Sequence, residues 1–206
     1  KLKQENLTQI ESQKSEPTAK ASEALGTMRS GHYPKNDVRY QPTMAEQTER
    51  YSAAKLEDAI AFYKGFYGAS NATFSAVGDF DEKELKALIT TEFASWKSPK
   101  PFTRVPEVFK DVKAQVKSIE TPDKANAFFL AYQPIKISDN DPDYASLEIA
   151  NYMLGGGSGL SSRLMNRIRQ KEGLSYGVGS QFAASPLDQS GAFVGYAIYA
   201  PENIAK

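Results

Sequence analysis

Arg169 and Tyr176 are the two side chains of this sequence whose chemistry and spacing best suit work on a bound molecule. A guanidinium offers permanent charge and several fixed N–H donors, and a phenol adds one directional O–H donor. Such a pair could stabilise an oxygen on which negative charge develops. A structural interpretation is also open, in which Arg169 favours a helix C-terminus through the macrodipole and Tyr176 is a half-buried strand aromatic.

The elements that must position this pair lie in residues 151–178, with the sequence NYMLGGGSGLSSRLMNRIRQKEGLSYGV. The pattern predicts a helix that ends in a glycine cluster, a second helix capped by serine, a stop at Gly173 and a strand that opens at Leu174. Arg169 then lies in the last turn of the second helix, and Tyr176 lies just inside the strand. We therefore expect both side chains at one corner of the fold.

The rest of the chain shows alternating blocks of helical and strand patterns. Hydrophobic spacing and capping residues predict further helices, over residues 15–29, 52–67, 81–96 and 141–154. Alternation predicts strands, at residues 72–80, 114–119, 126–133 and within 174–200. Residues 31–49 are expected to form a loop. Because strands follow one another, we expect an α+β fold of two layers, with a mostly antiparallel sheet of about four to six strands and helices packed on one face.

Aromatic residues line the helical faces of residues 52–67 and 81–96, and this spacing predicts that they form part of the core. The set comprises Phe62, Tyr63, Phe66, Tyr67, Phe93 and Trp96. The glycine cluster Gly155, Gly156, Gly157 and Gly159 is preceded by a helix and lacks the Gly-Lys-Ser/Thr of a phosphate loop. We interpret it as a sharp junction between two helices.

Composition excludes several classes of function. Lysine plus arginine and aspartate plus glutamate each number 25, so no net field attracts nucleic acid or an anionic membrane. The chain has no cysteine, which removes disulfides and thiolate chemistry and fits oxidising and reducing compartments alike. No apolar stretch approaches the roughly 18–20 residues that a membrane-spanning helix needs. We expect no nucleic-acid partner and no membrane partner.

Residues 151–178 resemble the C-terminal, non-zinc half of the pitrilysin/insulinase-like zinc peptidases, the family with an inverted zinc motif. That part of the family carries a glycine cluster, a Ser-Arg-Leu helix start and an Arg followed seven residues later by a Tyr. A second stretch, AIAFYKGFYGASNATFSAVGDFDEKELKALITTEFASW, is similar to the family's helix, strand, Gly-Asp and helix ending in Trp. The resemblance implies the family's C-terminal-type α+β domain over residues 45–206, truncated at its C-terminus. Residues 1–44 would be a helical segment and loop, the tail of a preceding unit.

The resemblance also implies where the metal is. These enzymes hold zinc with HxxEH and a downstream glutamate. This chain has one histidine, His32. We expect His32 to be a solvated loop residue, and metal ligation is the minority interpretation. The segment LTQIESQKSEP resembles the one that bears the glutamate ligand, and it places Gln9 at that position, or Glu11 if the alignment shifts by two. Zinc is therefore expected in the complete enzyme, bound outside this chain.

The function implied is that of the half without zinc in a zinc-dependent metalloendopeptidase, with Arg169 and Tyr176 contacting the substrate carbonyl and the oxyanion. Its partners would be a zinc-bearing lobe, either upstream on the same polypeptide or a separate subunit, and a peptide substrate. The resemblance favours the bacterial periplasm. Two alternatives stay open: a catalytically inactive structural relative, and a peptide-binding module, which an open edge strand near Tyr176 would favour.

Overall fold

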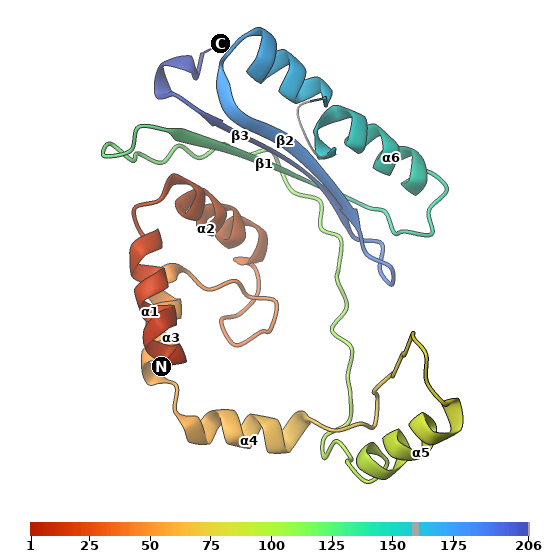
Figure 1. Cartoon of the computed structure of the whole chain (residues 1–206). Coiled ribbons are helices and arrows are strands. Elements are labelled where there is room, and N and C mark those ends of the chain that lie inside the picture. The colour runs from red at the N-terminus through yellow and green to blue at the C-terminus, as the bar shows by residue number, and fades with distance from the viewer. Residues whose placement is uncertain (158–160, 206) are drawn as a thin grey trace. The chain divides into compact units, whose positions relative to one another are not determined.

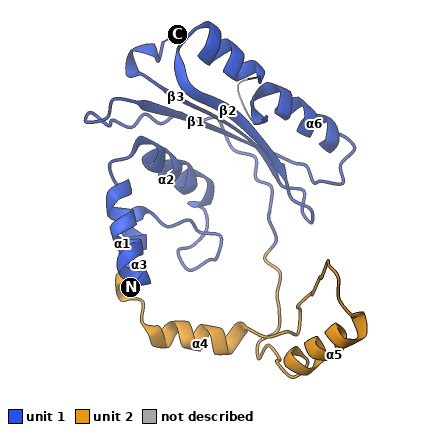
Figure 2. Cartoon of the chain, viewed as in Figure 1, with its two compact units in different colours: residues 1–51, 106–206 blue, residues 52–105 orange. Residues whose placement is uncertain are grey.

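The computed structural model describes residues 1–157 and 161–205, which form two compact units. Figure 1 shows the elements in order along the chain, and Figure 2 colours the two units. Unit 1 combines Lys1–Tyr51 with Pro106–Lys206, and unit 2 is Ser52–Val105. The predicted division into residues 1–44 and residues 45–206 stays a prediction.

The N-terminal part of unit 1 is helical. Its helices are α1 (Leu2–Gln13), α2 (Pro17–Ser30) and most of α3 (Met44–Ala53), which ends just inside unit 2. Helix α2 starts with proline in its first turn, where the missing N–H costs nothing. The predicted loop over residues 31–49 is wrong in its second part, because α3 starts at Met44. Thr43 and Glu46 explain this start: Glu46 N–H donates to the Thr43 hydroxyl at 3.2 Å, and Thr43 N–H donates to the Glu46 carboxylate at 2.9 Å, which makes a capping box.

The sheet of unit 1 has three antiparallel strands in the order β1-β3-β2. Its strands are β1 (Ala127–Ile135), β2 (Ser175–Ala184) and β3 (Gly191–Tyr199). Strand β1 pairs from Ala127 opposite Tyr199 to Ile135 opposite Gly191. Pro134 fits β1 because this strand lies at an edge of the sheet, where a missing N–H is tolerated. The α+β class and the antiparallel sheet are confirmed.

Helical segments cover the sheet of unit 1. Those that pack on β2 are α6 (Tyr144–Asn151) and two π-helical segments, η1 (Tyr152–Gly156) and η2 (Met165–Lys171). Helix α2 packs against β1, and Figure 1 shows it on the opposite side of the sheet from α6. The Arg29 guanidinium of α2 lies 4.2 Å from the ring centroid of Tyr132 on β1. A short 3-10 helix, η3 (Pro201–Asn203), follows β3.

Two predicted strands are wrong. Residues 72–80 and 114–119 alternate in hydrophobicity, yet in the structure neither belongs to a strand. Alternation describes one face of a strand, whereas strand formation also requires a neighbouring strand. Among the described residues the ladders join β1, β2 and β3, and an isolated bridge pairs Ser138 with Ser185. The sheet accordingly has three strands among the described residues, fewer than the four to six predicted.

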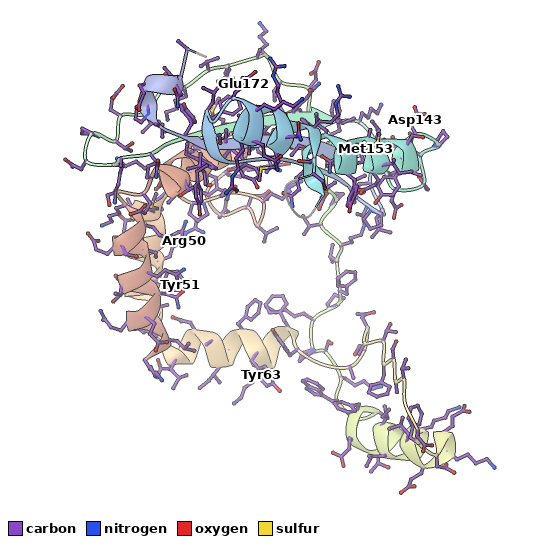
Figure 3. All side chains as sticks on the ribbon, turned by 45° about the horizontal axis from the view of Figure 1, so that its top comes forward. Arg50, Tyr51, Tyr63, Asp143, Met153 and Glu172 are labelled. Atoms are coloured by element: carbon purple, nitrogen blue, oxygen red, sulfur yellow. The ribbon has the colours of Figure 1, made fainter. Side chains whose placement is uncertain are left out.

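Unit 2 consists of α4 (Leu56–Phe66), α5 (Glu82–Phe93) and their connections. Asp81 caps α5 by accepting from Glu84 N–H at 2.8 Å. The aromatic side chains contact one another: Tyr63, labelled in Figure 3, lies 5.1 Å from Tyr67 and 6.2 Å from Trp96 between ring centroids. The prediction that these aromatics are core is wrong, because every member of the set is exposed by more than a third.

The described part of the chain contains no helix that is both long enough and apolar enough to span a bilayer.

Candidate functional site

The structure brings Arg169 and Tyr176 together. The Arg169 guanidinium carbon lies 5.2 Å from the centroid of the Tyr176 ring, within the range of a cation–π contact. Arg169 comes from η2 and Tyr176 from the start of β2, which are the two elements that the sequence predicted. Tyr176 is 74% exposed, so its phenol can reach a bound molecule. The predicted proximity is observed, and the catalytic role stays a prediction.

The connection between η2 and β2 is fixed by hydrogen bonds. Leu174 N–H donates to the Ile168 carbonyl at 3.0 Å, and Glu172 N–H donates to the Arg167 carbonyl at 3.2 Å. Gly173 between them has φ +63°, the left-handed conformation that favours glycine at the end of a helix. This cap turns the chain from the helix into the strand within a few residues. Arg169 and Tyr176 therefore meet because of local chain geometry.

Segment η2 is a π-helix, where the sequence pattern predicted an ordinary α-helix. Short π-helical segments are rare and often occur at functional sites, because they change the direction of side chains relative to an α-helix. Ser162 starts the helical region, with its carbonyl accepting from Asn166 N–H at 2.9 Å. Hydrophobic spacing over so few residues does not separate the two helix types, which is why sequence reasoning missed this feature.

A β-bulge places Tyr176 at the start of β2. Ser175 is paired with Tyr199 of β3 and Gly177 with Ile198, so Tyr176 is the extra residue between two paired positions. Bulges redirect a side chain and are frequent next to active sites. The strand carrying the bulge is also an edge strand, since β2 pairs with β3 alone in the described sheet. The sequence pattern predicts the strand but not the bulge.

The glycine cluster forms a close junction between η1 and β2. A Cβ on Gly155 would lie 2.6 Å from the Ser180 backbone nitrogen, and one on Gly156 would lie 2.3 Å from the Asn151 side-chain nitrogen. Ser180 Oγ donates to Asn151 Oδ1 at 2.8 Å across this junction. Gly155 thus allows a close contact with β2, and the predicted junction between two helices stays a prediction because residues 158–160, Gly159 among them, lie outside the described residues.

The two arginines at the end of η2 have different partners: Arg167 pairs with a carboxylate, and Arg169 contacts an aromatic ring. Arg167 forms an ion pair with Glu172, which follows η2 and is labelled in Figure 3. Arg169 has no carboxylate within ion-pair distance in the described part of the chain, and the contact of its guanidinium is with the Tyr176 ring. An aromatic face leaves the N–H donors of a guanidinium available at its edge.

The described residues do not fit a catalytic zinc ion. Across residues 1–157 and 161–205, no three His, Cys, Asp or Glu side chains gather closely enough to hold a metal. His32 is exposed in the loop after α2 and its ring lies 4.0 Å from that of Tyr33. Gln9 and Glu11 lie on the exposed part of α1, where Glu11 pairs with Lys14 at 2.5 Å. Catalytic zinc sites usually need three protein ligands.

Comparison with protein families gives one match, to the family described as the peptidase M16 inactive domain, over residues 53–206. The match includes η2, the bulged strand β2 and the Arg169–Tyr176 contact. The chain belongs to the peptidase M16 family. The resemblance to the non-zinc half of the pitrilysin/insulinase-like enzymes is thereby confirmed.

Solved structures agree with this peptidase M16 assignment. The crystal structure of a peptidase M16 inactive domain from Pseudomonas fluorescens is 28% identical, with a TM-score of 0.78, and covers 98% of this chain and 46% of its own. A protease from Helicobacter pylori shares the fold at 18% identity and a TM-score of 0.55, covering 90% of this chain and 47% of its own. The chain thus spans less than half the length of these two proteins. A search of curated proteins gave no match.

Proposed function

We propose that this chain is the half without zinc of a zinc-dependent metalloendopeptidase of the M16 family, and that Arg169 and Tyr176 contact the carbonyl of the scissile peptide bond. The observation that carries the proposal is the contact of the Arg169 guanidinium with the exposed Tyr176 ring, 5.2 Å from its centroid. Two donors of different type then lie at one corner of the fold, next to solvent.

The chemistry follows from what the two side chains can donate. When water attacks a peptide carbonyl, negative charge develops on the carbonyl oxygen, and donors fixed beforehand stabilise it. Tyr176 supplies an O–H, and Arg169 supplies N–H groups with permanent charge. The cation–π contact limits the rotation of both side chains, so less ordering is needed when substrate binds.

The zinc ion of this proposal belongs to another lobe. Zinc would supply the activated water, and its ligands would come from an upstream part of the same polypeptide or from a separate subunit, because the described residues do not fit it. The part that this chain plays is to bind the peptide and to stabilise the developing charge. A peptide substrate and a zinc-bearing lobe are therefore the proposed partners.

The test is turnover of a peptide by the full-length protein carrying Tyr176→Phe or Arg169→Lys. The matched controls are Tyr196→Phe, which changes a tyrosine of β3, and Arg167→Lys, which changes the neighbouring arginine of η2. A loss of turnover in the first two variants alone supports the proposal. Near wild-type turnover in all four folded variants overturns it.

A second candidate function is peptide capture without cleavage. It is favoured by the position of β2 at the sheet edge, next to Tyr176, because an extended peptide can add to an open strand through main-chain hydrogen bonds. Fluorescence anisotropy with a labelled extended peptide distinguishes the two functions. A binding module would hold the peptide intact in the full-length protein with zinc added, whereas a peptidase would cleave it.

A further inference from the structure

We propose that Ser175 is a positioning residue, whose hydroxyl fixes the β2 bulge and thereby holds Tyr176 against Arg169. The kinetic part of this inference rests on the proposed peptidase function, and the geometric part does not. Ser175 precedes Tyr176 directly and is 7% exposed, so its hydroxyl is removed from solvent while the next side chain is 74% exposed.

The Ser175 hydroxyl spans the bulge. Its Oγ lies 2.6 Å from the carbonyl oxygen of Ile198 on β3 and 2.8 Å from that of Gly177, two residues along β2. One of these carbonyls belongs to the neighbouring strand and the other to the residue that follows Tyr176. The single hydroxyl hydrogen is therefore shared between the two carbonyls of the Gly177–Ile198 pair, the first pair after the extra residue.

This geometry constrains the backbone on either side of Tyr176. A bulge leaves one residue outside the ladder, so the peptide groups around it lack the regular pairing that fixes a strand. The Ser175 contacts replace that pairing at the position where the ladder shifts register. Since these partly buried carbonyls would lose a donor, loss of the hydroxyl would leave the bulge free to rearrange, and the Tyr176 ring would move with it.

Ser180 offers a matched control on the same strand. It is also buried, at 4% exposure, and its hydroxyl donates one hydrogen bond at 2.8 Å, to Asn151 Oδ1. Its partner lies in the helical layer, and its contacts do not include the bulge. Replacing Ser180 should therefore leave the Arg169–Tyr176 contact in place, as replacing Ser175 would if Ser175 had only a structural role.

The geometric test is nuclear magnetic resonance of the full-length protein with ¹³C-labelled arginine. The Tyr176 ring displaces the Arg169 side-chain resonances through its ring current, and the difference between wild type and Tyr176→Leu defines that displacement. Ser175→Ala should lose most of it, and Ser180→Ala should keep it. Ser175→Cys provides a second variant that fills the same space with a weak donor, and it should also lose most of the displacement. An unchanged displacement in a folded Ser175 variant overturns the inference.

The kinetic test separates this inference from the proposed function. Ser175→Ala should lower kcat by about 10-fold to 100-fold with a smaller change in KM, because a small misplacement of a reacting group is costly. In a Tyr176→Phe background the same change should have little further effect, since the donor that it positions is already absent. Additive losses would overturn the positioning role. Full turnover in Tyr176→Phe would reject the peptidase role of the pair, and the resonance displacement would still decide whether Ser175 positions the ring.

Discussion

Ser180 and Asn151 join the sheet to the helical layer, with Ser180 Oγ donating to Asn151 Oδ1 at 2.8 Å directly beside Gly155. The backbone of η1 reaches β2 this closely because Gly155 has no side chain. Ser180 pairs with Gly195 of β3, away from the register shift at Tyr176. This packing holds the helical layer on β2 and is separate from the contacts that hold the bulge.

Gly155→Ala should lower the free energy of unfolding by about 1–3 kcal/mol, because the added methyl would overlap with packed neighbours. The new Cβ would lie 2.6 Å from the Ser180 backbone nitrogen and 2.8 Å from Leu164 Cδ1. Urea unfolding measures the change. Gly195→Ala on β3 is the control, since a Cβ there meets nothing within 4 Å. Equal stability of the two variants would contradict the close junction.

Acid should destabilise the N-terminal region of unit 1 through Glu46. Hydrogen bonds and ion pairing with Lys35, the Thr43 N–H and the Tyr40 hydroxyl lower the pKa of Glu46 from 4.5 to about 2. A carboxylate with a lowered folded pKa contributes stability that is present above its unfolded pKa and lost as pH falls. The contribution should therefore decline between pH 4.5 and about 2.

Thermal melts at a series of pH values, followed by circular dichroism, test this dependence. Glu46→Gln should reduce the fall in melting temperature over that range, and Glu57→Gln, in the first turn of α4, serves as the control carboxylate. The pKa of Asp37 is also lowered, to about 2, by its hydrogen bonds with Arg39, so part of the fall should persist in Glu46→Gln. An identical pH profile in Glu46→Gln and wild type would show that the contacts of Glu46 are not stabilising.

Some features of the candidate site follow from residues that are close in the sequence, and others do not. The glycine stop at Gly173 and the strand signal after it predict that Arg169 and Tyr176 meet, and both signals act within a few residues. The capping box of Thr43 and Glu46 is equally local, because a threonine and a glutamate three residues apart are enough to form it. The bulge at Tyr176 was not visible, because it depends on how β2 pairs with β3.

Non-local pairing also explains the errors in the fold. Residues 72–80 have the alternation of a strand, but the described residues give them no neighbour in a ladder. The aromatic set of unit 2 is likewise exposed, although the helices α4 and α5 that its spacing predicts are observed. A periodic pattern predicts which side of an element is apolar, and the tertiary partner decides whether that side is buried.

The isolated 206-residue chain should bind no stoichiometric zinc and should have no peptidase activity. The prediction rests on the donor set, because His32 is exposed in a loop and the described residues contain no cluster of three ligand side chains. Metal analysis of protein prepared without chelator provides the measurement, with His32→Gln as the comparison. Stoichiometric zinc that is lost in His32→Gln would contradict it.

Removing either donor of the pair should lower turnover more than it weakens substrate binding. Loss of one donor to a developing oxyanion typically reduces the rate by about 10² to 10³, and the effect appears in kcat because the interaction strengthens in the transition state. Tyr176→Phe keeps the ring that contacts Arg169 and removes only the hydroxyl. Arg169→Lys keeps the charge and removes the planar set of N–H donors.

The double variant decides whether the two side chains act on one group. If Tyr176 and Arg169 donate to the same oxygen, the loss in the double variant should be smaller than the product of the two single losses, because groups that act as a unit are not additive. Thermal melting of each variant separates this effect from unfolding, with Tyr196→Phe and Arg167→Lys as matched controls. A multiplicative loss would assign the two donors to different atoms of the substrate. A rise in KM at constant kcat would instead assign the pair to substrate binding alone.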